Sequence, residues 1–188
     1  VTATGGTPSL TYQWFSNLSN SNSGGSLITG ATSSTYTPSS LVAGTVYYYC
    51  VVSASGDGCA SATSNAVAVI VQTTPSAGTI GSDQTICSGG DPVAFTSSVN
   101  GTGDGVITYQ WQSSLNNSSW SNISSATSAT YDVPSGLTTT TYYRRVTVST
   151  LNGNACSSAA TNVLTVTVQT VPTAGTIAAS QTICNGGN

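Results

Sequence analysis

Charge is what this sequence lacks most. Only 4% of its 188 residues are charged, against about 25% in an ordinary soluble domain. Lys and His are absent, and the two basic residues are the adjacent Arg144 and Arg145. Phosphate recognition needs clustered basic side chains, so nucleic acid is excluded as a partner. There is also no apolar run of 18 residues, and we therefore expect no membrane insertion.

The residues of acid–base chemistry are equally scarce. Without His, Lys or Glu, a general acid or base would have to be one of five Asp residues. Their positions share no spacing that would bring two carboxylates together. We therefore predict no enzymatic activity and no cofactor. Asp83 and Asp104 are weak calcium candidates, because a lone Asp in a Gly-rich loop is usually a turn former, and no metal site is predicted.

Hydroxyl groups replace charge in this chain. Ser and Thr together make up 64 of the 188 residues, so solubility must depend on hydroxyls and amides. Five Cys in such a chain indicate an oxidising setting. We expect an extracellular location, either secreted or at the cell surface.

Internal repetition is the strongest positive signal. "YQW" begins at 12 and 109, "VQT" at 71 and 168, and "QTIC" at 84 and 181, each pair 97 positions apart. These offsets predict a domain lacking its first strand (1–74), a complete domain (75–171) and the first strand of a following domain (172–188).

Each repeat has the pattern of short β-strands. In "VLTVTV", Leu164, Val166 and Val168 alternate with a second set of residues, as in a half-buried strand, whereas helical periodicity is missing. The fold class predicted is all-β, with immunoglobulin-like antiparallel β-sandwiches in tandem. Strands are expected near 92–99, 106–113, 129–133, 140–149 and 161–170, and "VTAT" (1–4) as the second strand of its domain. The predicted core residues are Trp14, Trp111, Tyr48 and Tyr143.

The cysteines test this layout. If Cys87 opens the first strand of its sandwich, it lies at the same end as the hairpin that carries Cys156, and the two should form a disulfide. Cys59 is the copy of Cys156, and Cys184 is the copy of Cys87. The disulfide partners of Cys59 and Cys184 are expected in neighbouring copies of the repeat. Cys50 is replaced by Arg145 in the second repeat. A buried free thiol is the favoured interpretation of Cys50, a bridge to Cys59 is the alternative, and its orientation stays open.

The motifs "AGTI", "QTIC", "YQWQSS", "TTYYRRV" and "TNVLTVTVQT" together have a familiar order. The chain resembles the immunoglobulin-like tandem repeats of very large secreted surface proteins of Bacteroidota, including gliding-motility adhesins. The resemblance implies a non-enzymatic structural or adhesive segment of an extracellular fibre, with no catalytic residues to carry over.

Two kinds of partner follow from this hypothesis. The first is a neighbouring copy of the same repeat, either in one long chain or in a polymer whose subunits lend their first strand to the next. The alternative function is a loop-mediated module, calcium-dependent or not, that binds surface glycans or a receptor. Trp120 and Phe15 are the aromatic candidates for glycan contact.

Overall fold

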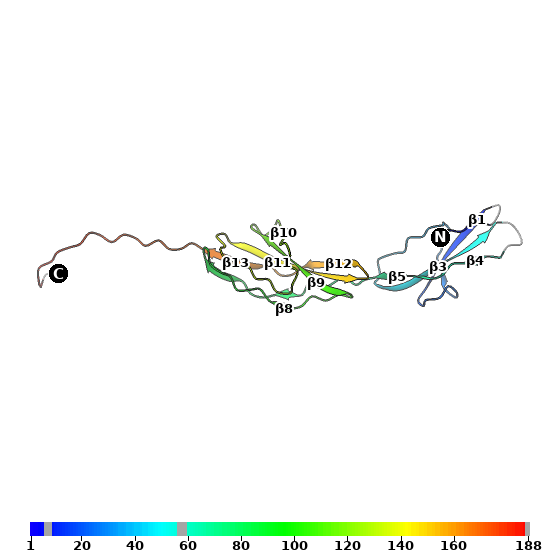
Figure 1. The fold of residues 1–188 in the computed structure, drawn as a ribbon, viewed down its shortest axis with the longest axis horizontal. Coiled ribbons are helices and arrows are strands. Elements are labelled where there is room, and N and C mark those ends of the chain that lie inside the picture. The colour runs from blue at the N-terminus through cyan, green and yellow to red at the C-terminus, as the bar shows by residue number, and fades with distance from the viewer. Residues whose placement is uncertain (6–8, 56–59, 187–188) are drawn as a thin grey trace. The chain divides into compact units, whose positions relative to one another are not determined.

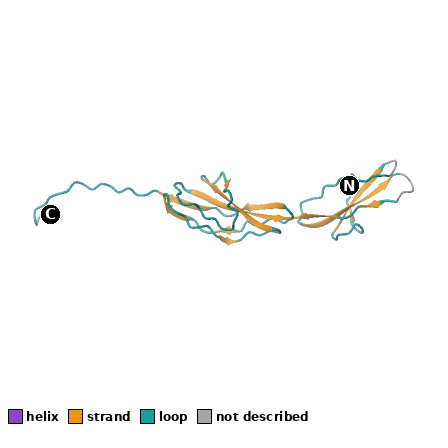
Figure 2. Cartoon of the chain, in the orientation of Figure 1, coloured by secondary structure: helices purple, strands orange, loops and turns teal. Residues whose placement is uncertain are grey.

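The computed structural model describes residues 1–5, 9–55 and 60–186. These residues form thirteen strands and no helix, so no helix among them is long and apolar enough to cross a membrane (Figures 1 and 2). The predicted all-β fold class is confirmed. Contacts divide the chain into two units. The first contains 1–75 with 103–106 and 149–156, and the second contains 76–102, 107–148 and 157–188.

The first unit is built on a single antiparallel sheet. The long strands β1 (Leu10–Asn17) and β3 (Gly44–Ala54) pair along their length, with Trp14 opposite Cys50. The short β2 (Ser26–Leu27) extends the sheet beyond β1, while β4 (Ala62–Thr63) and β5 (Val67–Val71) both pair with β3. Residues 1–4, expected to form a strand, lie outside every strand.

A second, larger sheet begins with β9 (Val106–Ser114) and β11 (Thr141–Leu151). Beside β9 lies β10 (Ser121–Asn122), and β11 also pairs with β12 (Asn154–Ala160) and β13 (Leu164–Gln169). The sheet ends at β7 (Gln84–Cys87), which pairs in parallel with β13. The predicted strands at 106–113, 140–149 and 161–170 therefore correspond to β9, β11 and the region of β12 and β13.

A small second layer closes this sandwich. It contains β6 (Thr79–Ile80) paired with β8 (Ser97–Val99), and an isolated bridge joins Phe95 to Tyr131. Between the layers lies a core that includes both predicted residues of this repeat, Trp111 and Tyr143, which are 0% and 4% exposed. The other buried members are Ile80, Phe95, Ala126, Val133, Leu164 and Val166.

A shift of 97 aligns residues 1 and 2 with the last two residues of β8, yet they form no strand. In the second unit β8 is held by β6, a strand of the segment 75–91. Residues 1–74 contain no copy of that segment. A strand without a hydrogen-bonding neighbour is not stable, because its backbone groups bind water equally well.

Local sequence sets the turn between β11 and β12. Asn152 and Gly153 have φ angles of 50° and 79°, the left-handed conformation that an Asn-Gly hairpin turn requires. This turn folds the chain back so that Thr161 donates its N–H to the carbonyl of Arg145. The turn "LNGNA" (151–155) therefore fixes the register of the hairpin that carries Cys156.

Candidate functional site

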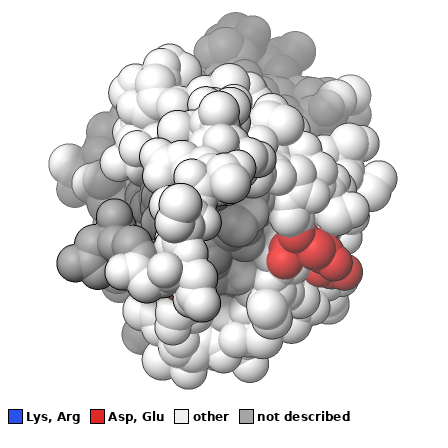
Figure 3. Space-filling view, turned by 90° about the vertical axis from the view of Figure 1, so that its left-hand side faces the viewer, with Lys and Arg blue, Asp and Glu red and all other residues white. Residues whose placement is uncertain are grey.

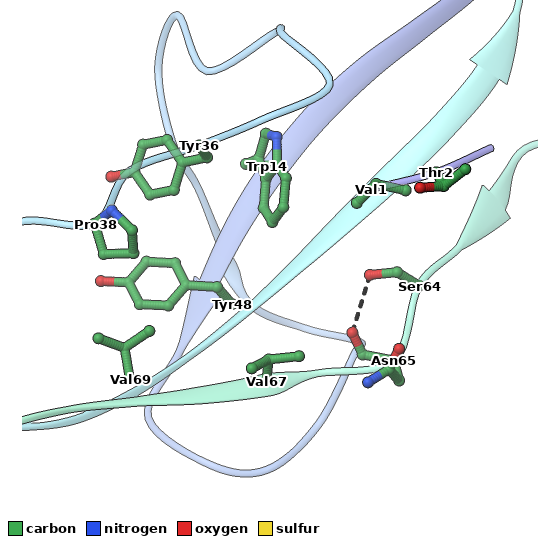
Figure 4. A pocket seen from close by; sticks show the side chains of 10 residues that line it. All are labelled: Val1, Thr2, Trp14, Tyr36, Pro38, Tyr48, Ser64, Asn65, Val67 and Val69. Carbon is green, nitrogen blue, oxygen red and sulfur yellow. Dashed lines mark hydrogen bonds between the residues drawn. The ribbon is translucent and has the colours of Figure 1, made fainter. Parts of the chain in front are cut away.

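An apolar groove on the first unit is the most distinctive cavity in the described residues. Its volume is about 530 Å³, and both predicted core residues of this repeat, Trp14 and Tyr48, lie in its wall. Figure 4 shows Tyr36, Pro38 and Tyr48 gathered near Val69, with Val67 farther along β5. The remaining lining residues are Val1, Thr2, Ser64 and Asn65. We call this surface the β5 groove.

The aromatic wall of the groove is internally ordered. The ring centroids of Trp14 and Tyr36 lie 5.9 Å apart, and those of Tyr36 and Tyr48 lie 5.7 Å apart. The indole Nε1 of Trp14 donates to the carbonyl of Ser33 at 2.9 Å. These contacts hold the rings in place although one side of them is uncovered.

In the second unit the same surface is buried. Trp14, Tyr48, Val67 and Val69 correspond to Trp111, Tyr143, Leu164 and Val166, all of which are at most 4% exposed. Val67, by contrast, is 57% exposed. The difference comes from residues 75–99, which place Ile80 and Phe95 in the core and Ile86 against it. The β5 groove is thus one half of a sandwich core.

Sequence reasoning found part of this site. It placed Trp14 and Tyr48 in a core, and in the structure both are half-buried and face the groove. It did not single out Tyr36, Val67 or Val69. The available signal was that 1–74 contains no copy of the segment that covers their counterparts.

Residues 172–186 repeat the sequence of 75–89, part of the segment that covers the core of the second unit, but they are themselves exposed. Residues 172–186 form no strand, and each of them is exposed. Ile177 and Ile183, the copies of Ile80 and Ile86, are 98% and 69% exposed. The segment was expected to be a first strand. No strand among the described residues pairs with it, and its assignment to a following domain remains a prediction.

The predicted bridge between Cys87 and Cys156 is wrong, because both residues are free thiols. Cys87 does not open the first strand of its sandwich. That strand starts where Ser76 bridges Thr102, and it ends with Cys87 beside Gln169. The neighbouring strand β13 pairs with residues 141–143 at the start of β11. Cys156 lies in β12, close to the turn at the other end of β11.

The remaining cysteines divide into three cases. Cys50 is free and 0% exposed, so its side chain points inward, and burial raises the pKa of its thiol. Cys184 is free and exposed. Cys59 lies outside the described residues. Pairing of Cys59 and Cys184 with neighbouring copies remains a prediction.

The two calcium candidates serve as hydrogen-bond acceptors in the structure. Asp104 accepts the backbone N–H of Thr73 at 2.6 Å and its hydroxyl at 2.8 Å. These bonds lower the pKa of the Asp104 carboxyl. Asp83 accepts the backbone N–H of Thr165 at 2.8 Å. Among the described residues, no three Asp or Cys side chains gather in a geometry that would hold a metal ion.

The aromatic candidates for glycan contact are both partly covered. The guanidinium of Arg144 lies 4.2 Å from the ring centroid of Trp120, and Phe15 stacks on Tyr49 at 5.2 Å. The face of the molecule drawn in Figure 3 is almost uncharged apart from one acidic patch. A surface of this kind offers hydroxyls and amides as its main polar groups.

Comparison with known families gives one match, to Domain of unknown function (DUF8696), at residues 1–73 and again at 76–170. The chain belongs to this family. It carries two DUF8696 domains, and the match covers nearly the whole chain. A search of curated proteins finds no match.

Two solved structures are similar to this tandem of DUF8696 domains. One contains three N-terminal domains of the bacteriophage RB49 Highly Immunogenic Outer Capsid protein, with 12% identity and a TM-score of 0.46 over 87% of this chain. The chain spans 58% of that structure. The other contains fibronectin(III)-like modules of Clostridium thermocellum CbhA, with 15% identity and a TM-score of 0.47 over 90% of this chain and 83% of that one.

Proposed function

We propose that this chain is a non-enzymatic structural or adhesive segment of an extracellular filament built from repeated immunoglobulin-like domains. Repetition carries the proposal. The same family matches twice along the chain, and residues 174–184 repeat 77–87 with "AGTI" and "QTIC" at the same spacing. A chain that presents one domain after another is suited to extension over distance.

The chemistry of the chain supports a role without catalysis. The carboxylates of Asp83 and Asp104 accept hydrogen bonds from backbone N–H groups. The groove is lined by aromatic and aliphatic side chains together with hydroxyl and amide groups. The titratable side chains that line the groove are the phenols of Tyr36 and Tyr48, and its lining contains neither Asp nor Cys.

The last residues of the first repeat are held by hydrogen bonds within the first unit. Gln72 donates through its side-chain amide to the carbonyl of Asn154 at 3.0 Å, and Thr73 is bound by Asp104. The sequence that joins the repeats is short and contains Pro75, which favours a stiffer connection than a Gly/Ser linker.

The proposal can be tested on cells of the source organism. Antibodies raised against the chain should label filaments at the cell surface in electron micrographs. After reduction, a denaturing gel should show either one band of very high mass, for many repeats in one chain, or a ladder of small subunits, for a polymer. Recovery of the antigen only as isolated two-domain particles inside cells would contradict the proposal.

Loop-mediated binding to surface glycans is the alternative to a purely structural role. Its candidates, Trp120 and Phe15, are both packed against neighbouring side chains. A glycan array probed with the full chain, with and without calcium, separates the two functions. Saturable binding that Trp120→Ala abolishes would support the alternative, and binding to no glycan would support the structural role.

A further inference from the structure

We propose that residues 172–186 of one copy of this chain bind to a second copy as a parallel strand along the free edge of β5, covering the β5 groove. The inference deepens the proposed function, since it names the surface through which repeats contact each other. Within the described residues, β5 pairs only with β3, so its other edge is open. An open edge beside an apolar groove can accept an added strand.

The second unit supplies the template for this contact. There β13, the copy of β5, pairs with β11 on one edge and with β7 on the other. The register of β13 with β7 places Val166 opposite Gln84 and Val168 opposite Ile86. Shifting each position by the repeat length of 97 places Gln181 opposite Val69 and Ile183 opposite Val71.

The side chains of the segment match the groove in the same way. In β7, Gln84 and Ile86 are half-buried while Thr85 and Cys87 are exposed. By this alternation Ile183 would point into the groove and Thr182 to solvent. Ile177 would occupy the position of Ile80, which is 4% exposed in the second unit.

Filling of the groove would be incomplete. In the second unit Phe95 stacks on Trp111 with ring centroids 5.8 Å apart, and residues 172–186 contain no counterpart of Phe95. Two of the three apolar residues that cover the core are therefore supplied. We expect saturable binding in which residues 172–186 make fewer apolar contacts with the groove than residues 75–99 make with the core of the second unit.

Binding of a labelled peptide tests the proposal directly. The peptide spans residues 172–186 with Cys184→Ser, and the receptor is the full chain carrying Ile177→Asp and Ile183→Asp, which disable its own segment. Both receptor substitutions lie at exposed positions outside every strand, so the fold should be unaffected. Fluorescence anisotropy should show saturable binding, and amide NMR shifts should concentrate in residues 67–71.

Matched peptides distinguish this contact from general stickiness. Ile183→Asp should weaken binding at least about tenfold, because it removes an apolar contact and places a charge against the apolar groove. Thr182→Asp adds the same charge one position away, on the outward face, and should change binding less than about threefold. Equal effects of the two substitutions, shifts confined to the second unit, or no saturation would overturn the proposal.

A thiol cross-link tests the register. In this register Cys184 would lie opposite Gln72. The side-chain Nε2 of Gln72 is 3.0 Å from the carbonyl oxygen of Asn154. Cys156 is two residues from Asn154, so Cys184 and Cys156 should be close to each other. With the native peptide, a short bis-maleimide should join Cys184 to Cys156, each thiol adding across one maleimide double bond. Mass spectrometry that finds the cross-link mainly at Cys87 would refute this register. If antibodies label filaments but the peptide does not bind the chain, strand addition is overturned and the proposed function still stands.

Discussion

Arg145 is a fully buried cation at the position that Cys50 occupies in the first repeat. Its Nη1 donates to the hydroxyl of Ser97 and the carbonyl of Ala129. Its guanidinium carbon lies 4.1 Å from the ring centroid of Tyr109. Among the described residues, Nε and Nη2 have no hydrogen-bond partner, and burial lowers the pKa of the group. The site therefore leaves part of the desolvation cost of this charge uncompensated.

Replacing Arg145 separates the roles of its charge and its volume. Arg145→Met keeps most of the side-chain volume and removes the unpartnered donors, so we expect the free energy of unfolding to stay within about 1 kcal/mol of wild type or to rise. Arg145→Ala leaves a cavity and should cost about 2–4 kcal/mol. Urea unfolding of the second unit measures both. Equal losses in the two variants would show that the polar contacts of the guanidinium dominate.

Tyr143 provides a second residue-scale test, at alkaline pH. Burial raises its pKa from 10.0 to about 12. The folded state therefore holds this proton more tightly than the unfolded state. The associated stability is fully present below pH 10 and is lost as the pH rises toward 12. Absorbance of tyrosinate should show a late-titrating component near pH 12 that Tyr143→Phe removes. Full titration below pH 10.5 in the folded protein would contradict this.

At the scale of elements, the alternation in "VLTVTV" predicted β13, where Leu164 and Val166 are buried. Along β11 the buried face carries Thr141, Tyr143 and Arg145, and its polar members do not stand out in an apolar pattern. The first strand of the sandwich was harder to predict. It is divided into β6 and β7, which pair with different sheets, and strands of two to four residues are too short to show periodicity. Cys87 was therefore placed at the wrong end of its strand.

The candidate site was predictable only in part for a related reason. The immunoglobulin-like pattern, with a Trp in an early strand and a Tyr pair in a late one, identified Trp14 and Tyr48 as core members. Whether a core surface is covered depends on which segments pair across the sheet. That pairing is a long-range property, and neither the spacing of residues nor their propensity within 1–74 specifies it.

The loop that contains Asp104 makes a prediction at this scale. Its carboxylate binds the N–H and hydroxyl of Thr73, and these bonds lower its pKa below the ordinary value of 3.8. The contribution to stability is thus present above that value and is lost as the pH falls through the lowered pKa. The Thr73 amide resonance should shift with a midpoint below 3.8, and Asp104→Asn should abolish the shift. A midpoint at or above 3.8 would show that the bonds do not form in solution.

At the scale of the whole molecule, the scarcity of charge controls proteolysis. Trypsin cleaves after Lys or Arg, and this chain offers only Arg144 and Arg145, in the middle of β11. Arg145 is 0% exposed. A protease needs several residues of extended chain, so cleavage there requires β11 to leave its sheet. Trypsin therefore has few points of attack on the folded second repeat.

The uncovered groove predicts that the two repeats differ in stability. The first repeat leaves Val67 57% exposed, whereas its counterpart Leu164 is 3% exposed in a closed core. With less apolar area removed from water, the first repeat should unfold at lower urea concentration. Hydrogen exchange in increasing urea should release the amides of β1 and β3 before those of β9 and β11.

Tryptic cleavage at Arg144 and Arg145 should begin only when the second repeat unfolds. The peptide of residues 172–186 should move the first transition to higher urea and leave the second unchanged. Simultaneous loss of both repeats would mean that the groove does not limit the stability of the first.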